Sequence, residues 1–472
     1  MSSPHVVVIP NPEQGHVIPL LELSQNLAKH GLRITFVNSE YNHNRVLESL
    51  EGKNYIGEQI HLVSIPDGIE PWDDRSDMRK LLEKRLQVMP GKLEGLIEEI
   101  HGREGEKIAC LIADGAAGWA IEVAEKMKLR RAVVVITSAA TVALTFSIPK
   151  LIEDGVINSN GKIFNSFFVL IINLFWTPIK EQMIQLAPNM PAISTGELFW
   201  TRFGDLTMQK IFFDFMVQNM RATRAVDFQL CNSTYELEGG AFSMIPELLP
   251  IGPLLASNRL GNSAGYFLPE DSKCVEWLDQ QQANSVIYVA LGSHTVLEQN
   301  QFQELALGLE ICNRAFLWVV RPDITNDAND AYPEGFRERV AARGQMISWS
   351  PQQKVLTHPS ISCFMSHCGW NSTTEGVSNG VPFLCWPFFA DQFMNTTYIC
   401  DVWKVGLRLE RNQSGIIGRE EIKNKVDQVL GDQNFKARAL KLKEKALSSV
   451  REGGSSNKAI QNFVQSIKQW PA

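Results

Sequence analysis

The clearest structural pattern in the chain lies in the 44 residues from Trp349 to Gln392, WSPQQKVLTHPSISCFMSHCGWNSTTEGVSNGVPFLCWPFFADQ. Its centre is a short apolar run, Ile361–Met365, which predicts a buried strand. The glycine-containing loop Ser366–Gly369 follows, and a helix is expected to begin near Asn371 or Ser372. Because the amides at a helix N-terminus point outward and the glycine lets a ligand approach the backbone, this strand, loop and helix predict an anion site.

Two further patterns concern helix ends. Ser372–Glu375 and Thr295–Glu298 both have the Ser/Thr-x-x-Glu spacing of a capping box. The first lies at the start of the helix expected near Asn371 or Ser372, and the second precedes another expected helix, Glu298–Ile311. Gly380 is expected just beyond the end of the first of these helices, where a left-handed backbone favours glycine.

The rest of the chain alternates predicted strands and helices. It opens with an apolar strand, His5–Ile9, a helical pattern, Val17–His30, and a second strand, Leu32–Val37, so a parallel sheet is implied. A second α/β series begins at Val286 and continues through the Trp349–Gln392 stretch. The pattern predicts an α/β protein with two doubly wound halves. Further strands of the first half are expected at Ile60–Ile65, Ile108–Ala113, Ala132–Ile136 and Phe228–Cys231, the last of which is expected to end that half.

The boundary between the halves is expected near residue 250. Proline and glycine cluster between Pro246 and Pro253, and a polar run, Ser257–Gly265, follows. This composition is typical of an interdomain linker. We therefore predict an N-terminal domain of residues 1–245, a linker of residues 246–265 and a C-terminal domain of residues 266–455.

Length and composition restrict the class of protein. The 472 residues suffice for two or three domains, and the formal net charge of −7 gives no general attraction for nucleic acid or anionic lipid. The longest apolar stretch, Ile163–Trp176, falls short of the roughly 20 residues that a membrane span needs. The eight cysteines show no paired framework, and reduced thiols are their simplest interpretation. We expect a cytoplasmic protein with no membrane span and no nucleic-acid partner.

The Trp349–Gln392 stretch resembles the signature box of plant UDP-dependent glycosyltransferases that act on small molecules. The resemblance extends to Gln14–Pro19 and to Leu291–Ser293. It implies a GT-B fold, in which two Rossmann-like doubly wound domains face each other across a cleft and a C-terminal helix, residues 456–470, crosses back to the first domain. The positions that match the box at the family's spacing are Trp349, Pro351, Gln352, His358, His367–Ser372, Glu375, Gly380–Pro382, Asp391 and Gln392.

Two residues are candidates for proton transfer. His16 lies in the predicted loop after the first strand, at the carboxyl edge of the sheet, and histidine has a suitable pKa for a general base. Taken alone, a loop histidine is usually an ordinary surface residue. Asp114 follows the strand Ile108–Ala113 and could either orient an imidazole or cap the next helix. The resemblance implies that His16 and Asp114 form the catalytic dyad.

The resemblance assigns the UDP-sugar to the C-terminal domain. Trp349 would stack on uracil, Gln352 would lie near the uridine, and Glu375 would accept hydrogen bonds from the ribose hydroxyls. The capping-box interpretation of Glu375 competes with that role. The remaining donor positions that the resemblance implies are Ser293, His367, Gly369, Asn371 and Ser372 for the phosphates, and Trp370, Asp391 and Gln392 for the sugar.

The expected activity is therefore transfer of glucose from UDP-glucose to a hydroxyl of a small apolar plant metabolite, with inversion. In this family Gln392 together with Trp370 favours glucose over galactose. No cofactor and no metal are expected, because the helix N-terminus, His367 and hydroxyls can meet the phosphate charge and the sequence contains no Asp-x-Asp pair. The alternatives are a nucleotide-sugar epimerase and a non-catalytic UDP-sugar sensor.

The acceptor is expected to be a flavonoid or another phenolic, with terpenoids next, and the protein is expected to be a monomer. Two residues depart from the family pattern: His294 follows Ser293 where a bulky apolar residue is more usual, and Lys128 stands where a helix-ending glycine is expected. The expected walls of the acceptor pocket are Glu13, Trp119, Thr137, Thr141, Phe199 and Phe389.

Overall fold

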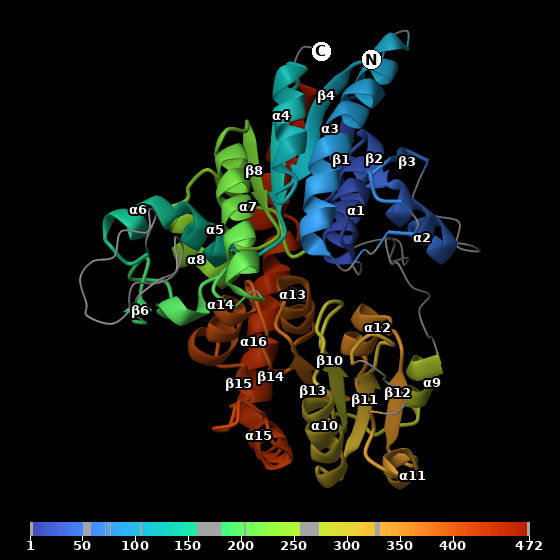
Figure 1. Ribbon diagram of the computed structural model, residues 1–472, viewed down its shortest axis with the longest axis vertical. Coiled ribbons are helices and arrows are strands. Elements are labelled where there is room, and N and C mark those ends of the chain that lie inside the picture. Colours follow the sequence, from blue (N-terminus) through green and yellow to red (C-terminus); the bar gives the residue numbers. More distant parts are fainter. Residues whose placement is uncertain are drawn as a thin grey trace. The chain divides into compact units, whose positions relative to one another are not determined.

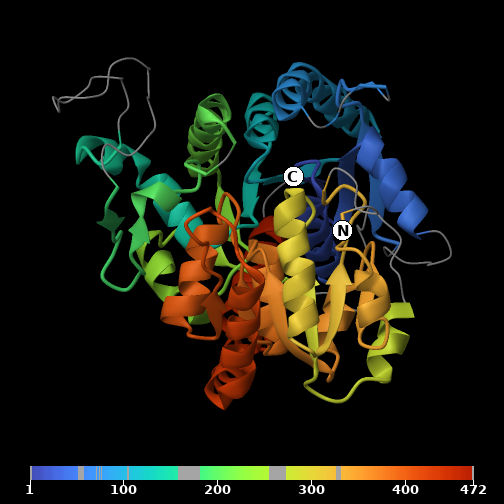
Figure 2. The same ribbon diagram turned by 60° about the horizontal axis from the view of Figure 1, so that its bottom comes forward.

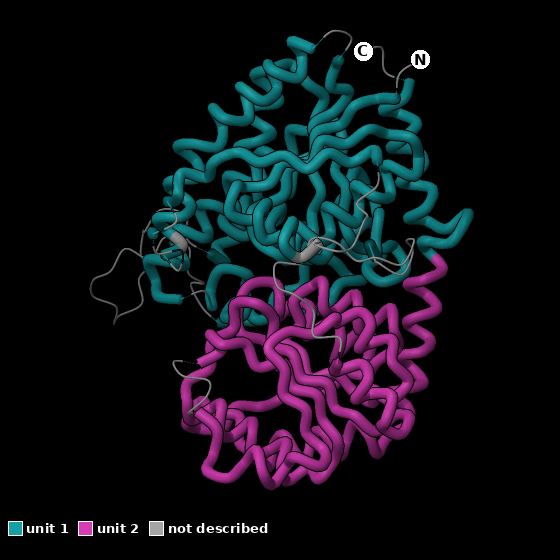
Figure 3. Tube along the Cα trace, turned by 90° about the vertical axis from the view of Figure 1, so that its right-hand side faces the viewer, with its two compact units in different colours: residues 1–267, 449–472 teal, residues 268–448 magenta. Residues whose placement is uncertain are grey.

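The computed structural model describes residues 3–50, 58–70, 72–73, 75, 77–103, 106–157, 181–202, 204–254, 273–325 and 331–469. The chain divides into two compact units: unit 1 comprises residues 1–267 and 449–472, and unit 2 comprises residues 268–448 (Figure 3). The apolar stretch Ile163–Trp176 lies outside the described residues. Within the described part of the chain, no helix combines the length and apolar character that a membrane crossing requires.

Unit 1 is built on a parallel sheet with the strand order β3-β2-β1-β4-β5-β8-β9. All six pairings between neighbouring strands are parallel. Because β1 pairs with β4, the segments that follow these two strands are neighbours at the carboxyl edge of the sheet. The strands are β1 (His5–Ile9), β2 (Arg33–Ser39), β3 (Ile60–Ile65), β4 (Ile108–Asp114), β5 (Arg131–Val135), β8 (Phe228–Cys231) and β9 (Leu248–Pro250).

Helices cover both faces of this sheet (Figure 1). In β1, Val6 and Val8 pack with α1 and α17 on one face, and Val7 packs with α3 and α4 on the other. The C-terminal helix α17 completes the first of these cores, where the ring of Phe463 meets that of Phe228 edge-on at 5.1 Å. The helices of unit 1 are α1 (Gln14–Lys29), α2 (Glu40–Leu50), α3 (Met78–Gly102), α4 (Gly118–Lys126), α5 (Ala139–Phe146), α6 (Ile148–Glu153), α7 (Leu206–Arg224), α8 (Tyr235–Met244) and α17 (Ser455–Lys468). A short hairpin, β6 (Met183–Ile184) and β7 (Ile193–Ser194), and a 3₁₀ turn, η1 (Thr195–Glu197), complete the described elements.

The sheet of unit 1 extends one strand further than the sequence predicted. Phe228–Cys231 was expected to be the last strand of this half, but β9 pairs with it in parallel at the edge of the sheet. Leu248 is buried there, and Pro250 is tolerated because an edge strand leaves one row of backbone amides unpaired. The start of the predicted linker is thus a strand, and its residues 255–265 lie outside the described part of the chain.

Unit 2 repeats the α/β pattern on a parallel sheet with the order β12-β11-β10-β13-β14-β15. On one face, Phe302 of α10 and Val426 of α15 join Val289 of β10 in a single core, and α10 lies along the strands (Figure 2). Both units are therefore Rossmann-like, as predicted. The strands of unit 2 are β10 (Val286–Ala290), β11 (Ala315–Val319), β12 (Gly344–Ile347), β13 (Ile361–Ser366), β14 (Phe383–Cys385) and β15 (Gly406–Arg408). Its helices are α9 (Lys273–Asp279), α10 (Gln299–Ile311), α11 (Phe336–Val340), α12 (Gln352–Thr357), α13 (Trp370–Asn379), α14 (Gln392–Thr397), the π-helix η3 (Tyr398–Val402), α15 (Arg419–Gly431) and α16 (Gln433–Val450).

Both predicted capping boxes are wrong. α13 begins at Trp370 with Gly369 as its N-cap, so Ser372 already lies inside the first turn and cannot cap it. α10 has Glu298 as its N-cap, three residues after Thr295. The spacing occurs in both places, but the chain enters each helix at another residue. Gly380 does end α13 in the left-handed conformation, with φ 66°, as predicted.

Candidate active site

His16 and Asp114 are brought together at the carboxyl edge of the unit 1 sheet. His16 Nδ1 lies 2.8 Å from Asp114 Oδ2, across 98 residues of sequence. α1 begins at Gln14, so His16 lies in the first turn of this helix and not in the loop where the sequence placed it. Asp114 is the last residue of β4 and is almost completely buried, whereas the His16 side chain is 24% exposed. The pair thus presents an accessible imidazole held by a buried carboxylate.

The geometry of the pair determines which imidazole nitrogen is basic. A carboxylate only accepts hydrogen bonds, so His16 Nδ1 carries the proton and Nε2 keeps its lone pair. Asp114 Oδ1 accepts a second hydrogen bond from the amide of Ala116 at 2.7 Å. Asp114 thus orients His16 and supports the turn before α4, but the prediction that it could cap that helix is wrong, because α4 begins at Gly118 with Ala117 as its N-cap.

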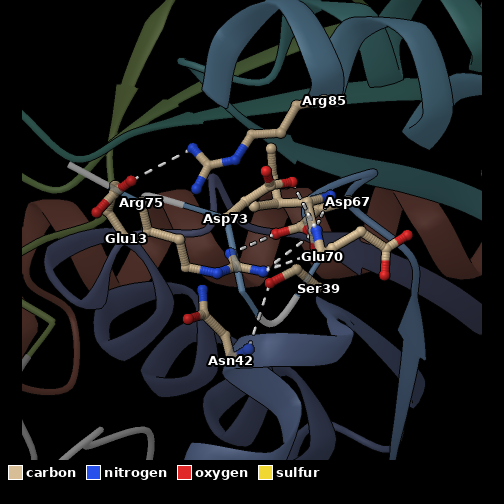
Figure 4. A network of polar contacts seen from close by, with 9 residues as sticks. Glu13, Ser39, Asn42, Asp67, Glu70, Asp73, Arg75 and Arg85 are labelled. Atoms are coloured by element: carbon tan, nitrogen blue, oxygen red, sulfur yellow. Dashed lines mark hydrogen bonds and ion pairs between the residues drawn. The ribbon is translucent and has the colours of Figure 1, made fainter. Parts of the chain in front are cut away.

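Glu13, in the segment that precedes His16, belongs to a group of polar contacts in unit 1 (Figure 4). The Glu13 carboxylate pairs with Nη1 of Arg85 of α3 at 3.3 Å, and the Arg85 side chain is only 10% exposed. The carbonyl of Glu13 accepts hydrogen bonds from the amides of His16 and Val17. Because these contacts tie the start of α1 to α3, the Glu13–Arg85 pair restrains the turn that carries His16. In the same group of contacts Asp67, after β3, pairs with Arg75 at 2.9 Å.

The residues predicted to line an acceptor pocket are spread over both units. Glu13 and the half-buried Thr137 belong to unit 1, and Thr137 lies just beyond β5. Trp119 is packed into the core formed with α3 and α4, and Thr141 is buried with its hydroxyl 2.8 Å from that of Ser138. The two phenylalanines are divided: Phe199 of unit 1 stacks on Phe212, whereas Phe389 belongs to unit 2. Their role as pocket walls stays a prediction.

In unit 2, two glycines enclose the imidazole of His367. A Cβ at Gly292 would lie 2.6 Å from His367 Nε2, and a Cβ at Gly369 would lie 2.5 Å from the same atom. Any side chain at either position would displace the ring, so both glycines are required for its placement. Gly292 follows β10 and His367 follows β13, and these two strands are neighbours. The segments after them therefore form one continuous surface at the carboxyl edge.

The surroundings of His367 keep its ring neutral. Burial, reinforced by the positive charge of Arg321 and by the neighbouring His294, lowers the pKa of His367 from 6.5 to about 4. The Nδ1 atom is buried and makes no hydrogen bond within the described residues. A neutral imidazole beside the N-terminus of α13 can donate to a phosphate oxygen, and a bound anion would favour its protonated form.

Arg321 anchors the segment that carries Ser293. It follows β11, is 4% exposed, and donates hydrogen bonds to the carbonyls of Gly292 and Thr295. Its Nε donates to Asp323 at 2.9 Å. Because both bonded carbonyls belong to the turn after β10, the guanidinium fixes that turn and adds a buried positive charge near His367.

The predicted uridine and ribose positions form a connected polar group. The Gln352 side chain donates from Nε2 to Glu375 Oε2 at 2.6 Å and to the Ser372 hydroxyl at 2.9 Å. Gln353 Nε2 donates to the other carboxylate oxygen of Glu375 at 3.1 Å. Burial raises the pKa of the Glu375 carboxyl, and the hydrogen bonds from the two glutamines oppose this rise. Trp349, which follows β12, is half-buried.

The predicted sugar-binding residues follow β14 and begin α13. The side-chain oxygen of Gln392 accepts from the backbone amides of Phe388 and Phe389 at 2.8 and 3.2 Å, which fixes the direction of its amide nitrogen. Asp391 accepts from Asn395 at 2.9 Å. All eleven predicted donor residues therefore belong to unit 2, on segments that follow strands of its sheet or on the helices that those segments begin. These residues are Ser293, Trp349, Gln352, His367, Gly369, Trp370, Asn371, Ser372, Glu375, Asp391 and Gln392.

Two arginines that support these sites were missed by the sequence reasoning. Arg85 lies within the long helix α3, 72 residues from Glu13, and no sequence motif links two residues at that separation. Arg321 lies two residues after the buried strand β11, and a charge at that place is the signal that could have found it. The described residues contain no group of three or more His, Cys, Asp or Glu side chains arranged to hold a metal ion.

Known proteins are similar to this chain in sequence and in fold. The profile of the family described as "UDP-glucoronosyl and UDP-glucosyl transferase" matches residues 264–447. UDP-glycosyltransferase 83A1 of Arabidopsis thaliana is 45% identical over 99% of this chain and 97% of its own length. A 7-deoxyloganetin glucosyltransferase of Gardenia jasminoides is 31% identical over 98% and 97%. The crystal structure of Os79 from O. sativa in complex with UDP superposes with a TM-score of 0.80 at 26% identity, covering 98% of this chain and all of that one.

These similarities extend over the whole chain and agree with the two Rossmann-like units. The structure therefore has the GT-B architecture of enzymes that use nucleotide sugars. The chain belongs to the plant UDP-glycosyltransferases. Both the predicted family and the predicted enzyme class are confirmed.

Proposed function

We propose that this enzyme transfers glucose from UDP-glucose to a hydroxyl group of a small apolar plant metabolite, with inversion at the anomeric carbon. The observation that carries the proposal is the His16–Asp114 pair, in which an accessible imidazole is held 2.8 Å from a buried carboxylate. His16 Nε2 would remove the proton of the acceptor hydroxyl as its oxygen attacks the sugar. Asp114 would hold the imidazole and stabilise the imidazolium that forms.

The donor would bind in unit 2. Trp349 would stack on uracil, Glu375 and Gln352 would bind the ribose, and Trp370, Asp391 and Gln392 would face the glucose. The turn held by Arg321, the His367 imidazole and the first amides of α13 would meet the negative charge of the diphosphate. With these groups in place we propose that the reaction needs no metal ion. Direct displacement of UDP from an α-linked donor then gives a β-glucoside.

The proposed acceptor is a flavonoid or another phenolic, with terpenoids as the next class. The relative from Gardenia is named for 7-deoxyloganetin, so that compound belongs in any panel of candidate acceptors. We further propose that the enzyme acts in a reducing compartment such as the cytosol. All eight of its cysteines are free thiols, which supports this.

The proposal is tested by UDP release from UDP-glucose across this panel in the presence of EDTA. Wild type is compared with His16→Ala and with His101→Ala, a control that removes an exposed histidine at the end of α3. We expect UDP release to require an acceptor. Its rate should fall by about 10²-fold or more in His16→Ala and stay at the wild-type level in His101→Ala. The anomeric coupling of the product, measured by proton NMR, reports inversion.

Other outcomes would select a different function. UDP-glucose binding without turnover of any acceptor would favour a sensor. Formation of another UDP-hexose without an acceptor would indicate an epimerase. Full activity of His16→Ala would refute the proposed base while leaving the transferase intact.

A further inference from the structure

A chain of hydrogen bonds inside unit 2 leads from a buried tyrosine to the proposed ribose site. The hydroxyl oxygens of Ser350 and Tyr288 lie 2.6 Å apart, and the Tyr288 hydroxyl donates to Gln352 Oε1 at 3.0 Å. Gln352 Nε2 then donates to Glu375 Oε2 at 2.6 Å. A tyrosine hydroxyl has one proton, and this proton goes to Gln352, so Ser350 donates to the Tyr288 oxygen. The chain therefore has a single direction, from Ser350 to Glu375.

This direction fixes the orientation of the Gln352 carboxamide. An amide can rotate so that its oxygen and nitrogen exchange places, and only one orientation suits both neighbours here. Tyr288 requires the oxygen on its side, and the Glu375 carboxylate requires the nitrogen on the other. Without the Tyr288 hydroxyl, the amide oxygen of Gln352 loses its donor. The Glu375 carboxylate alone then selects the orientation, because it would repel the oxygen of a rotated amide, whereas the Ser372 hydroxyl could accept from the nitrogen or donate to the oxygen.

Tyr288 is too deeply buried to touch a ligand, so its hydroxyl can affect the ribose site only through Gln352. Tyr288 lies in the middle of β10 and is completely buried, with its ring stacked on Phe364 at 5.0 Å. A phenylalanine would fill the same space without a polar atom to satisfy, and a buried hydroxyl is destabilising unless it is hydrogen-bonded. The Tyr288 hydroxyl is hydrogen-bonded on both sides, and one of these partners contacts Glu375.

We infer that Tyr288 is a positioning residue for the ribose of the donor. Through Gln352 it holds the Glu375 carboxylate in the orientation that binds the two vicinal ribose hydroxyls. Gln352 and Gln353 each occupy one oxygen of that carboxylate from the protein side. A carboxylate has about four acceptor positions, so positions for two hydroxyl donors remain. The inference rests on the proposed function of Glu375 as the ribose acceptor, and it adds a residue that never touches the ligand.

The inference is tested by titrating the full-length protein with UDP and with 2′-deoxy-UDP. The ratio of the two dissociation constants isolates the contribution of the 2′-hydroxyl, and no acceptor is needed. The variant is Tyr288→Phe, and the matched control is Tyr332→Phe. Tyr332 is also in unit 2 and packs on Phe336 and Trp318, outside the Ser350–Glu375 chain. Ser350→Ala removes the other end of the chain and serves as a second variant if Tyr288→Phe does not fold.

For Tyr288→Phe we expect UDP binding to weaken by roughly 2- to 10-fold, the range of one hydrogen bond, while 2′-deoxy-UDP binding changes little. The preference for UDP over 2′-deoxy-UDP, measured as the ratio of the two dissociation constants, therefore falls. Ser350→Ala should lower the preference in the same direction, and Tyr332→Phe should leave both constants unchanged. Equal weakening of both ligands would show a merely structural role, and unchanged constants would show no role; either result overturns the inference.

A Glu375→Ala variant separates this inference from the proposed function. If Glu375→Ala keeps the wild-type preference for UDP over 2′-deoxy-UDP, then Glu375 does not bind the ribose and the proposed donor site is wrong at that position. If Glu375→Ala loses the preference and Tyr288→Phe keeps it, the donor site stands and only the positioning role of Tyr288 fails.

Discussion

At the scale of single residues, the proposed chemistry depends on which nitrogen of His16 carries the proton. Asp114 holds the proton on Nδ1 and is itself held by the amide of Ala116. An asparagine at position 114 could still accept from Ala116 through its oxygen, but its amide nitrogen would face His16. It would then donate to Nδ1 and leave the proton on Nε2, the wrong nitrogen for a base.

We therefore predict that Asp114→Asn lowers kcat by about 10²-fold or more, with little change in the affinity for UDP-glucose. The check is a comparison of steady-state kinetics with a binding titration of the same variant. Retention of the wild-type kcat would mean that Asp114 does not set the tautomer of His16.

His367 provides a prediction about the pH dependence of donor binding. In the free protein its pKa is lowered to about 4, so the ring is neutral at pH 7. The diphosphate anion stabilises the protonated ring and raises this pKa in the complex. Binding then takes up a proton, and affinity should increase as the pH falls from 7.5 to 5.5.

UDP-glucose is the suitable ligand for this measurement, because its diphosphate has no group that titrates in this range. Calorimetry in buffers of different ionisation enthalpy measures the proton uptake directly. A His367→Gln variant should bind more weakly, and its affinity should be independent of pH. An affinity of the wild type that does not change with pH would contradict protonation of His367 in the complex.

At the scale of elements, the strands were easier to predict than the helix ends. Apolar runs such as Val286–Leu291 identify buried strands because both faces of a parallel sheet are covered. A helix starts where the backbone changes from the conformation of the preceding loop to helical dihedral angles. The Ser372–Glu375 spacing could not show that this change occurs at Gly369. The chain entered α1 before His16 for the same reason.

Site residues could be proposed from the sequence where a local motif carries them. His16, Asp114 and the donor positions were predicted through spacing and resemblance, and the structure brings His16 and Asp114 into contact. Arg85, Arg321 and Tyr288 were not predicted, because each acts through a partner that is distant in sequence, and no period or spacing links them. Residues that hold a site in place are defined by tertiary contacts, and these appear only in the folded chain.

Lys128 gives a prediction about a helix end. It follows α4 with φ 58°, its amide donates to the carbonyl of Glu125, and the amide of Leu129 donates to that of Ala124. The left-handed conformation costs a residue with a Cβ about 1–2 kcal/mol, and glycine adopts it without that strain. Lys128 therefore occupies the position where the family pattern has glycine, at some expense in stability.

Lys128→Gly should raise the free energy of unfolding by roughly 0.5–1 kcal/mol, since part of the gain is offset by the greater freedom of glycine in the unfolded chain. Urea denaturation at neutral pH measures the change, and activity should stay at the wild-type level. Lys128→Ala, which removes the charge but keeps the Cβ, is the matched control. Equal stabilisation by alanine would show that the charge and not the backbone is responsible.

At the scale of the whole molecule, the two units are not independent segments of sequence. Unit 1 comprises residues 1–267 and is completed by residues 449–472, so the chain builds unit 2 before it supplies the last helix of unit 1. Apolar residues of α17 such as Phe463 are buried in the unit 1 core. Unit 1 therefore cannot bury its complete core until the whole chain has been made.

The pH dependence of stability should reflect the histidines whose pKa values burial lowers, above all His5 in unit 1 and His367 in unit 2. Burial lowers the pKa of His5 in unit 1 from 6.5 to about 4, and His367 in unit 2 is lowered to the same value. Below pH 6.5 the unfolded chain binds protons at these positions that the folded chain does not bind. The free energy of unfolding must therefore fall as the pH drops from 6.5 toward 4, by up to about 3 kcal/mol for each histidine. Glu375 acts in the opposite sense, because its raised pKa makes its burial less costly as the pH falls.

The contribution of His5 can be isolated with His5→Gln, in which an amide can replace the hydrogen bond between the ring and the Thr35 hydroxyl at 2.8 Å. Calorimetry at pH 7 and pH 5 should show a smaller loss of stability in this variant than in the wild type. His101→Gln, which changes an exposed histidine of the same unit, should lose as much as the wild type. If His5→Gln and the wild type lose stability equally, the proton that destabilises unit 1 in acid binds elsewhere. Because His5 lies at the opposite end of β1 from the segment that carries His16, the substitution should leave transferase activity at pH 7 unchanged.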